Sequence, residues 1–357
     1  MPRVRQRAAS ITRDVRGGRG AALGPIQRCS LGATVDARPA IAGHAERMKA
    51  IGIPWRGDAN VLEVVDRTVR DAGPGEVRIR VRAAAVNPAD IQLRQGGVDG
   101  IPPPWVPGME AAGVVESVGD GVERLAVGDE VMAAINPRRP EGGAQAELVV
   151  VPAASVVWIP DGATLEASAT LPMNGMTAFL GLELLDLEPG QTLAVSGGAG
   201  QLASYVIPIA KMRGLRVVAD SSRADEALVR GFGADLVLRR GARYPDDVRD
   251  ALGGDGADGL FDTAGLGPAA VPAVRDGGRL AVVRGWAGDD PERGIEVKRV
   301  GVSAEMQRTE WLEQLRALAA DGTLQLRVVH TYSPEEAREA HRAMEAGGLR
   351  GRGVIVF

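Results

Sequence analysis

A glycine-rich loop is the feature of this chain that most restricts its fold. The loop reads Ser196-Gly197-Gly198-Ala199-Gly200-Gln201-Leu202 and joins an apolar run, Thr192–Ser196, to a segment with helical periodicity at 200–213. Small residues at such a junction let the backbone approach a pyrophosphate, and the helix N-terminus offers free N–H groups. The loop therefore predicts a dinucleotide-binding site that includes Gly197, Gly198, Ala199, Gly200, Gln201 and Leu202.

Strands and helices alternate along the sequence around this loop. Short apolar strands are predicted at 192–196, 215–219, 236–238, 259–262 and 280–283, and helices at 200–213, 223–232 and 268–276. This alternation is typical of a parallel, doubly wound sheet. Pro208 lies inside the first of these helices and is expected to kink it, since an interior proline costs about 3 kcal/mol.

The segment before the loop has a different pattern. Polar and apolar residues alternate at 76–82, which predicts a half-buried strand, and short strands are predicted at 114–118 and 128–132. The C-terminal part is mixed, with helices expected at 308–320 and 334–346 and strands at 326–330 and 353–357. We therefore expect an α/β chain that combines a β-rich domain with a nucleotide-binding domain.

Composition excludes several classes of protein. The 42 basic and 46 acidic residues give a net charge of −4, so no basic surface favours nucleic acid. Cys29 is the single cysteine and the three histidines are scattered, so neither an internal disulfide nor a metal site is expected. The longest strongly apolar stretch, 148–159, is far shorter than the roughly 20 residues of a membrane-spanning helix. These features favour a cytoplasmic protein that binds a small molecule.

Residues 1–47 differ from the rest of the chain. They contain nine arginines, no lysine and three acidic residues, and they lack the apolar core of a secretory signal. We interpret the segment as a disordered extension, with an arginine-rich targeting peptide as the alternative, and place the first strand near Met48.

The residues after the second predicted strand bear on the choice of nucleotide. Asp220 lies 20 residues after Gly200, where an acid usually holds the ribose 2′-hydroxyl of NAD. Ser221, Ser222 and Arg223 follow, and these could hydrogen-bond and neutralise the 2′-phosphate of NADP. A third interpretation is that Asp220 only caps the next helix. We favour NADP and keep NAD as the alternative.

Further motifs make the chain resemble the medium-chain dehydrogenases/reductases. The stretch at 107–115 resembles the signature of that family, and Asn87-Pro88-Ala89-Asp90 resembles its zinc-independent, quinone-oxidoreductase-like branch. Met109 stands where zinc-dependent relatives usually carry a ligand histidine. The resemblance implies a GroES-like catalytic domain, residues 48–166 and 326–357, which encloses a Rossmann domain, residues 167–325.

The resemblance also implies roles for single residues. Asn87 and Thr177 would line the nicotinamide and substrate end of the site, and Asn87 would orient the substrate. Either Asp90 or water would supply a proton. Turn roles remain the alternative for both, with Asn87 capping the turn before Pro88 and Asp90 bonding its own backbone. Cofactor contacts would also come from Gly265, Gly285, Trp286 and Arg352.

The resemblance implies an NADPH-dependent reductase that acts on a quinone or an α,β-unsaturated carbonyl, often as a homodimer joined through a strand at 295–302. The tyrosines that such relatives often carry are absent at 54–58 and 91–94, so an NAD-dependent dehydrogenase and a non-catalytic NADPH-binding protein remain alternatives. Arg94 is interpreted as either a contact for an acidic substrate or an exposed side chain. We interpret His330 and His341 as structural or surface residues.

Overall fold

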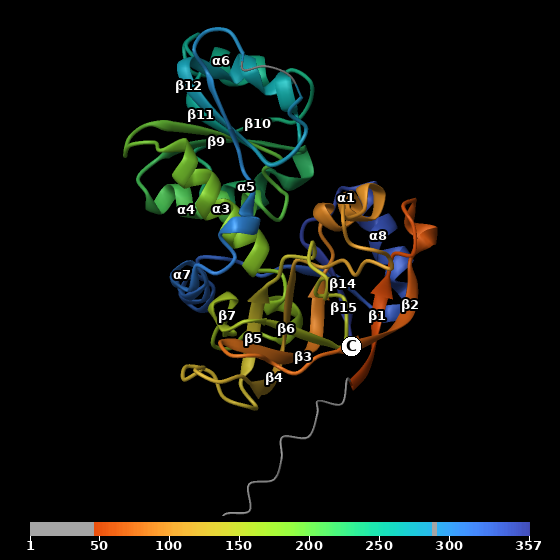
Figure 1. Cartoon of the computed structure of the whole chain (residues 1–357). Coiled ribbons are helices and arrows are strands. Elements are labelled where there is room, and N and C mark those ends of the chain that lie inside the picture. The colour runs from red at the N-terminus through yellow and green to blue at the C-terminus, as the bar shows by residue number, and fades with distance from the viewer. Residues whose placement is uncertain (1–45, 288–290) are drawn as a thin grey trace, which may run out of the picture. The chain divides into compact units, whose positions relative to one another are not determined.

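A computed structural model describes residues 46–287 and 291–357 (Figure 1). The described residues belong to one compact unit. Most of the predicted extension, 1–47, lies outside the described residues, so its disorder stays a prediction. The first strand, β1 (Glu46–Gly52), begins two residues before the start expected at Met48.

Six parallel strands form the predicted doubly wound sheet. Their order is β10-β9-β8-β11-β12-β13, and every neighbouring pair is parallel. The strands are β8 (Thr192–Ser196), β9 (Arg216–Ser221), β10 (Leu236–Arg239), β11 (Ala257–Asp262), β12 (Val274–Val282) and β13 (Glu296–Arg299). Strand order reverses between β8 and β11, where α/β sheets of this kind bind their ligands.

Helices cover both faces of this sheet (Figure 1). One face packs α3 (Pro172–Leu185) and α4 (Ala203–Met212) against Leu193 and Val195. The opposite face packs α6 (Tyr244–Ala251) and the 3-10 helix η4 (Gly267–Ala273) against Ala194. Successive residues of β8 thus point to opposite faces, and both are buried, which explains why the strand reads as a continuous apolar run.

A second sheet contains seven strands. The path is β14-β15-β3-β4-β5-β7, and β6 pairs with β3. A separate antiparallel pair joins β1 to β2 (Glu63–Val69). The seven strands are β3 (Glu76–Ala85), β4 (Glu110–Val118), β5 (Glu130–Ala134), β6 (Leu148–Pro152), β7 (Val156–Trp158), β14 (Val328–Tyr332) and β15 (Arg352–Val356). Strands from both ends of the described chain therefore share one β-rich layer, although the domain boundaries at 166 and 325 remain predictions.

The remaining helices are short. They are α1 (Pro88–Gly96), α2 (Leu165–Ser168), α5 (Glu226–Gly231), α7 (Thr309–Ala320) and α8 (Ala337–Ala346). The 3-10 turns are η1 (Ala59–Val61), η2 (Ala153–Ser155), η3 (Arg223–Asp225), η5 (Val302–Ala304) and η6 (Pro334–Glu336). None of the helices in the described ranges is both long and apolar enough to cross a membrane.

One predicted helix is wrong. The sequence suggested a helix at 268–276, but the chain forms the 3-10 helix η4 and enters β12 at Val274. Pro272 lies inside η4 and has no N–H to donate, which disfavours an α-helix at this point. Pro208 lies inside α4, and the kink expected at this residue stays a prediction.

Candidate cofactor and active site

Two cavities meet beside the glycine loop. One, of about 220 Å³, is lined by Thr177, Met109 and Met173, and the other, of about 200 Å³, is lined by Gly197 and Gly200. The residues that line both cavities are Pro88, Leu202, Thr263, Arg284 and Arg352. A ligand longer than either cavity could therefore extend from the glycine loop to the methionine-lined end.

The backbone of the glycine loop leaves no room for larger side chains. A Cβ on Gly198 would lie 2.5 Å from the carbonyl oxygen of Asp220, and Gly197 has a φ of +70°. The N–H of Gly200 donates to the carbonyl of Gly197 at 2.8 Å, and α4 begins at Ala203. The loop is thus a tight turn that leads directly into a helix N-terminus, a geometry suited to a pyrophosphate.

Asp220 is tied to this loop. Its Oδ1 accepts a hydrogen bond from the N–H of Gly198 at 2.8 Å, and the residue is only 5% exposed. Burial raises the pKa of the carboxyl above its ordinary value. The helix-cap interpretation of Asp220 is wrong, because Ser222 caps η3 by accepting the N–H of Asp225 on its Oγ.

Arginines gather at the end of β9, next to Asp220. A cavity of about 410 Å³ is lined by Ser221, Ser222, Arg223 and Arg239, and also by Glu226. Nearby, Arg350 donates to both carboxylate oxygens of Asp225, at 2.9 and 2.6 Å, which helps to lower the pKa of Asp225 to about 2. Glu226 is paired with Arg230 at 2.9 Å. Arg223 and Arg239 therefore give this cavity an excess of positive charge.

A fully buried polar network forms one wall of the methionine-lined cavity. The Nδ2 of Asn87 donates to Glu110 at 2.8 Å, and the Nδ2 of Asn174 contacts the same carboxylate oxygen at 3.1 Å. Arg352 donates to the side-chain oxygens of Asn87 and Asn174, each at 2.7 Å. Since β4, α3 and β15 each contribute a residue, the network joins segments that are far apart in the sequence.

The two buried carboxyl groups near this wall are engaged by the backbone. Asp90 accepts the N–H groups of Asn87 and Gly108, each at 2.7 Å, one on each oxygen. Glu110 accepts the N–H of Met173 at 2.8 Å on the oxygen that faces away from Asn87. Burial raises the pKa of Asp90 to about 6 and that of Glu110 to about 7, although hydrogen bonds and Arg352 oppose the shift.

Among the other predicted site residues, Thr177 lines one of the two meeting cavities, whereas Gly265, Gly285 and Trp286 line neither. The hydroxyl of Thr177 donates to the carbonyl of Met173 at 2.7 Å and lines the larger of the two meeting cavities. Gly265 and Gly285 both have a φ of +79°, and neither of them nor Trp286 lines these two cavities. Their neighbours Thr263, Ala264 and Arg284 do so instead.

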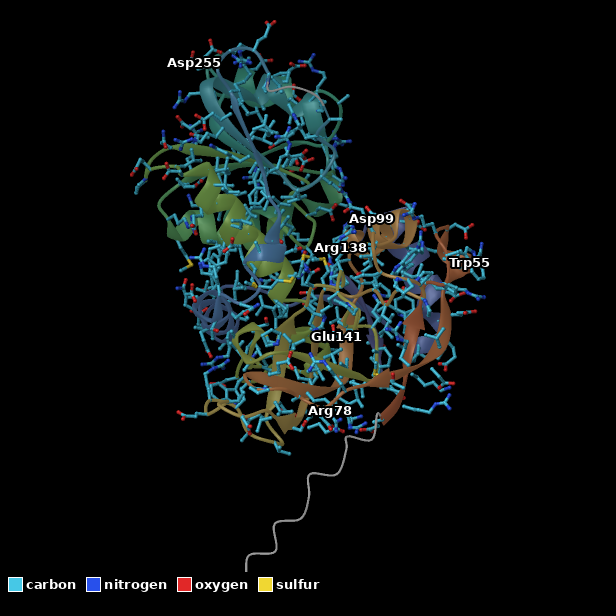
Figure 2. The ribbon with its side chains drawn as sticks, viewed as in Figure 1. Trp55, Arg78, Asp99, Arg138, Glu141 and Asp255 are labelled. Atoms are coloured by element: carbon cyan, nitrogen blue, oxygen red, sulfur yellow. The ribbon has the colours of Figure 1, made fainter. Side chains whose placement is uncertain are left out.

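Neither interpretation of Arg94 as a substrate contact or an exposed side chain is correct. Arg94 is fully buried, pairs with Glu345 and donates to the carbonyl of Gly57 at 3.0 Å. Its Nη1 lies 3.2 Å from Nδ1 of His341, and burial beside this cation lowers the pKa of His341 to about 3. His341 is thus a structural residue, as predicted. Trp55, in contrast, is a large side chain of this region that is 61% exposed (Figure 2).

Comparison with known proteins identifies the family. The alcohol dehydrogenase GroES-like domain matches residues 73–161, and a domain described as zinc-binding dehydrogenase matches residues 232–355. A solved structure of an NAD-dependent alcohol dehydrogenase is 30% identical, with a TM-score of 0.76, and the match covers 87% of this chain and 100% of the other. The chain belongs to the medium-chain dehydrogenase/reductase superfamily.

Individual relatives differ in what they bind. Mycobacterial Rv1454c complexed with NADPH is 27% identical with a TM-score of 0.76, over 87% of this chain and 100% of that one. The 2-methylene-furan-3-one reductase of Solanum lycopersicum is 34% identical over 247 residues, which are 67% of this chain and 62% of the reductase. This chain therefore aligns with less than two thirds of that reductase. Quinone oxidoreductases are also among the matching solved structures.

One of the two matching domains is described as zinc-binding, so it matters whether this chain has side chains that could ligate a metal ion. Within 46–287 and 291–357, His, Cys, Asp and Glu side chains form no group of three or more that could hold a metal ion. Met109, whose position is usually a histidine in zinc-dependent relatives, is buried at the methionine-lined end of the site.

Sequence reasoning did not select several residues of the site. Glu110 and Asn174 carry a signal, because each is a lone polar side chain within an apolar segment that the fold buries. Thr263 and Arg284 directly follow predicted strands, so the sequence indicated that they lie at the ends of those strands. Neither residue belongs to a motif that would have identified it as part of the site. Arg240 lines the glycine-loop cavity and lies 4.0 Å from Asp220.

Proposed function

We propose that this chain is an NADPH-dependent oxidoreductase that works without a metal and reduces a quinone or a C=C bond conjugated to a carbonyl. The choice of NADPH over NADH rests on the hydrogen bonding and burial of Asp220. Its Oδ1 accepts the N–H of Gly198, its Oδ2 lies 4.0 Å from Arg240, and it is almost fully buried, so both oxygens have neighbours that compete with a ribose hydroxyl. Arg223 and Arg239 beside it are suited to a 2′-phosphate.

The residues present suit the pyrophosphate and the nicotinamide end of such a dinucleotide. Gly197, Gly198 and Gly200 would cradle the pyrophosphate, because a Cβ on Gly198 would collide with the backbone. Thr177 and Leu202 would lie at the nicotinamide end. When bound, NADPH supplies a hydride, and the protein has to fix the distance and angle to the acceptor and keep the cleft dry.

The methionine-lined end suits a small acceptor with an apolar body. Met109, Met173 and Val302 line it, while Gln92 and Ser303 are two of its neutral polar residues and could bond a carbonyl oxygen. We assign Asn87 to holding Arg352 and Glu110 in place, since its amide is already bonded to both. Asp90 holds the N–H groups of Asn87 and Gly108, so we assign the proton of the product to water.

The names of relatives favour the same substrate class. A 2-methylene-furan-3-one contains a C=C bond conjugated to a ketone, and the tomato relative is named as its reductase. The test is NADPH oxidation, followed by absorbance, with methyl 4-oxopent-2-enoate as a neutral enone and 1,4-benzoquinone as a quinone. Turnover of either compound supports the proposal. Tight NADPH binding without turnover of either would make the chain a nucleotide-binding protein instead.

An NAD-dependent dehydrogenase is the second candidate, because one of the matching solved structures carries that name. It predicts reduction of NAD⁺ with alcohols and no preference for the 2′-phosphorylated cofactor. Alcohol oxidation that is faster with NAD⁺ than with NADP⁺ would favour this candidate over the first.

A further inference from the structure

Arg284 lies where the two cavities of the site meet. It follows β12 by two residues and is one of the five residues that line both cavities. A Cβ on Gly265 would approach the Nε of Arg284 to 3.1 Å, so the side chain lies against the loop that follows β11. It is exposed rather than part of the core.

The charge of Arg284 is not compensated within the described part of the chain. It forms no hydrogen bond or ion pair with any residue of 46–287 or 291–357, and neither cavity is lined by Asp or Glu. The neighbouring arginines have partners, since Arg352 donates to Asn87 and Asn174 and Arg350 pairs with Asp225. Among the described residues, Arg284 is therefore the arginine lining both cavities that has no protein partner and could bind a ligand.

A guanidinium presents paired donors that match the oxygens of a carboxylate or a phosphate. We propose that Arg284 binds an anionic oxygen group at the junction of the two cavities. Two sources have this chemistry, namely the pyrophosphate of the cofactor and a carboxylate on the substrate. The second source rests on the proposed function and would narrow the substrate class to unsaturated carbonyl compounds that carry an acid.

The first experiment measures binding and needs no turnover. Calorimetric titration of the full chain with NADPH and with inorganic pyrophosphate compares the wild type with Arg284→Ala and Arg284→Lys. The matched control is Arg82→Ala, which removes an exposed arginine of β3 that lines neither cavity. If the pyrophosphate is the source, Arg284→Ala weakens both ligands about tenfold or more, Arg284→Lys recovers part of the loss, and the control is unchanged.

The second experiment compares two substrates that differ by one charge. These are 4-oxopent-2-enoate and its neutral methyl ester, each reduced with NADPH. If the substrate carboxylate is the source, the wild type prefers the acid, and Arg284→Ala lowers kcat/KM for the acid about tenfold while kcat/KM for the ester stays the same. Calorimetric titration of the NADPH complex with the acid gives the same comparison if neither compound is turned over.

The outcomes separate this inference from the proposed function. Unchanged affinity for NADPH, pyrophosphate and the acid in Arg284→Ala overturns the inference, even when the ester is reduced. Failure to reduce the ester or a quinone overturns the proposed function, while an effect of Arg284→Ala on binding would still support the anion site. Circular dichroism and the thermal midpoint of each variant exclude loss of folding as the cause.

Discussion

At the scale of single residues, Glu110 is the carboxyl group of the buried network. Its carboxylate oxygens accept hydrogen bonds from Asn87, Asn174 and the backbone of Met173, and Arg352 lies close enough to favour the ionised form. Burial outweighs these contacts and raises the pKa to about 7, from an ordinary value of 4.5. Asp90 behaves in the same way, with a pKa of about 6.

These shifts predict a fall in stability as the pH rises. The folded protein binds the proton of Glu110 more tightly than the unfolded chain does, so its contribution is fully present below about 4.5 and is lost as the pH rises through about 7. Glu110→Gln should therefore make the free energy of unfolding depend less steeply on pH across this range. Urea unfolding at a series of pH values measures the slope, and an unchanged slope in the variant would contradict the raised pKa.

Some site residues could be predicted from the sequence because their chemistry is local. The tight turn at Gly197 and Gly198 follows from a strand, small residues and a helix in succession. The partnership of Asn87 with Glu110 and Arg352 could not be predicted, since these residues are brought together only by the folding of distant strands. The burial of Arg94 could not be predicted either, because its partner Glu345 lies on α8, 251 residues further along the chain.

At the scale of elements, α3 shows why a helix can escape detection. Its residues are apolar on every side, so no hydrophobic stripe marks a helical period, and eleven of its fourteen residues are buried. Two glycines allow this close packing. A Cβ on Gly175 would lie 2.6 Å from Leu315, and a Cβ on Gly181 would lie 2.1 Å from the ring of Phe261.

Gly181→Ala should therefore destabilise the protein. The added methyl group would clash with Phe261, which is fully buried in β11 and has no room to move. Overpacking typically costs about 1–3 kcal/mol, and a contact as short as 2.1 Å favours the upper part of that range, so we expect the cost to exceed the gain of about 1 kcal/mol in helix propensity. Chemical denaturation of the variant measures the difference.

Gly231→Ala is the matched control for that variant. Gly231 ends α5 and is exposed, and a Cβ added there would have no other atom within 4 Å. The same substitution should leave stability unchanged or raise it by up to about 1 kcal/mol. Equal effects of the two substitutions would show that the contact with Phe261 is not the cause.

Strands were predicted better than the elements between them. The bounds of β8 agree with the predicted strand at both ends, because turn residues on either side of a short apolar run mark where the strand begins and ends. The helix at 268–276 was wrong because the interior Pro272 outweighed the surrounding residues. The helix α6 was not predicted, although Tyr244 and Val248 are spaced four apart and both are buried.

At the scale of the whole molecule, the sheet edge at β13 bears on assembly. Only one side of β13 is paired, with β12, so its other side is an open edge in the described chain. We propose that two copies associate there, as the resemblance to the family implied. Sedimentation equilibrium should then give twice the 37.3 kDa of one chain, and a mass of 37.3 kDa at micromolar concentration would contradict the dimer.

Selection of NADPH over NADH by this chain can be measured by equilibrium titration with the two nucleotides. We expect NADPH to bind about tenfold or more tightly than NADH, because Arg223 and Arg239 line the cavity that would take the 2′-phosphate, while Asp220 is bonded to Gly198. Arg223→Ala should remove most of that preference and leave NADH affinity unchanged, with Arg82→Ala as the control. Equal or tighter binding of NADH, with no effect of Arg223→Ala, would contradict the account.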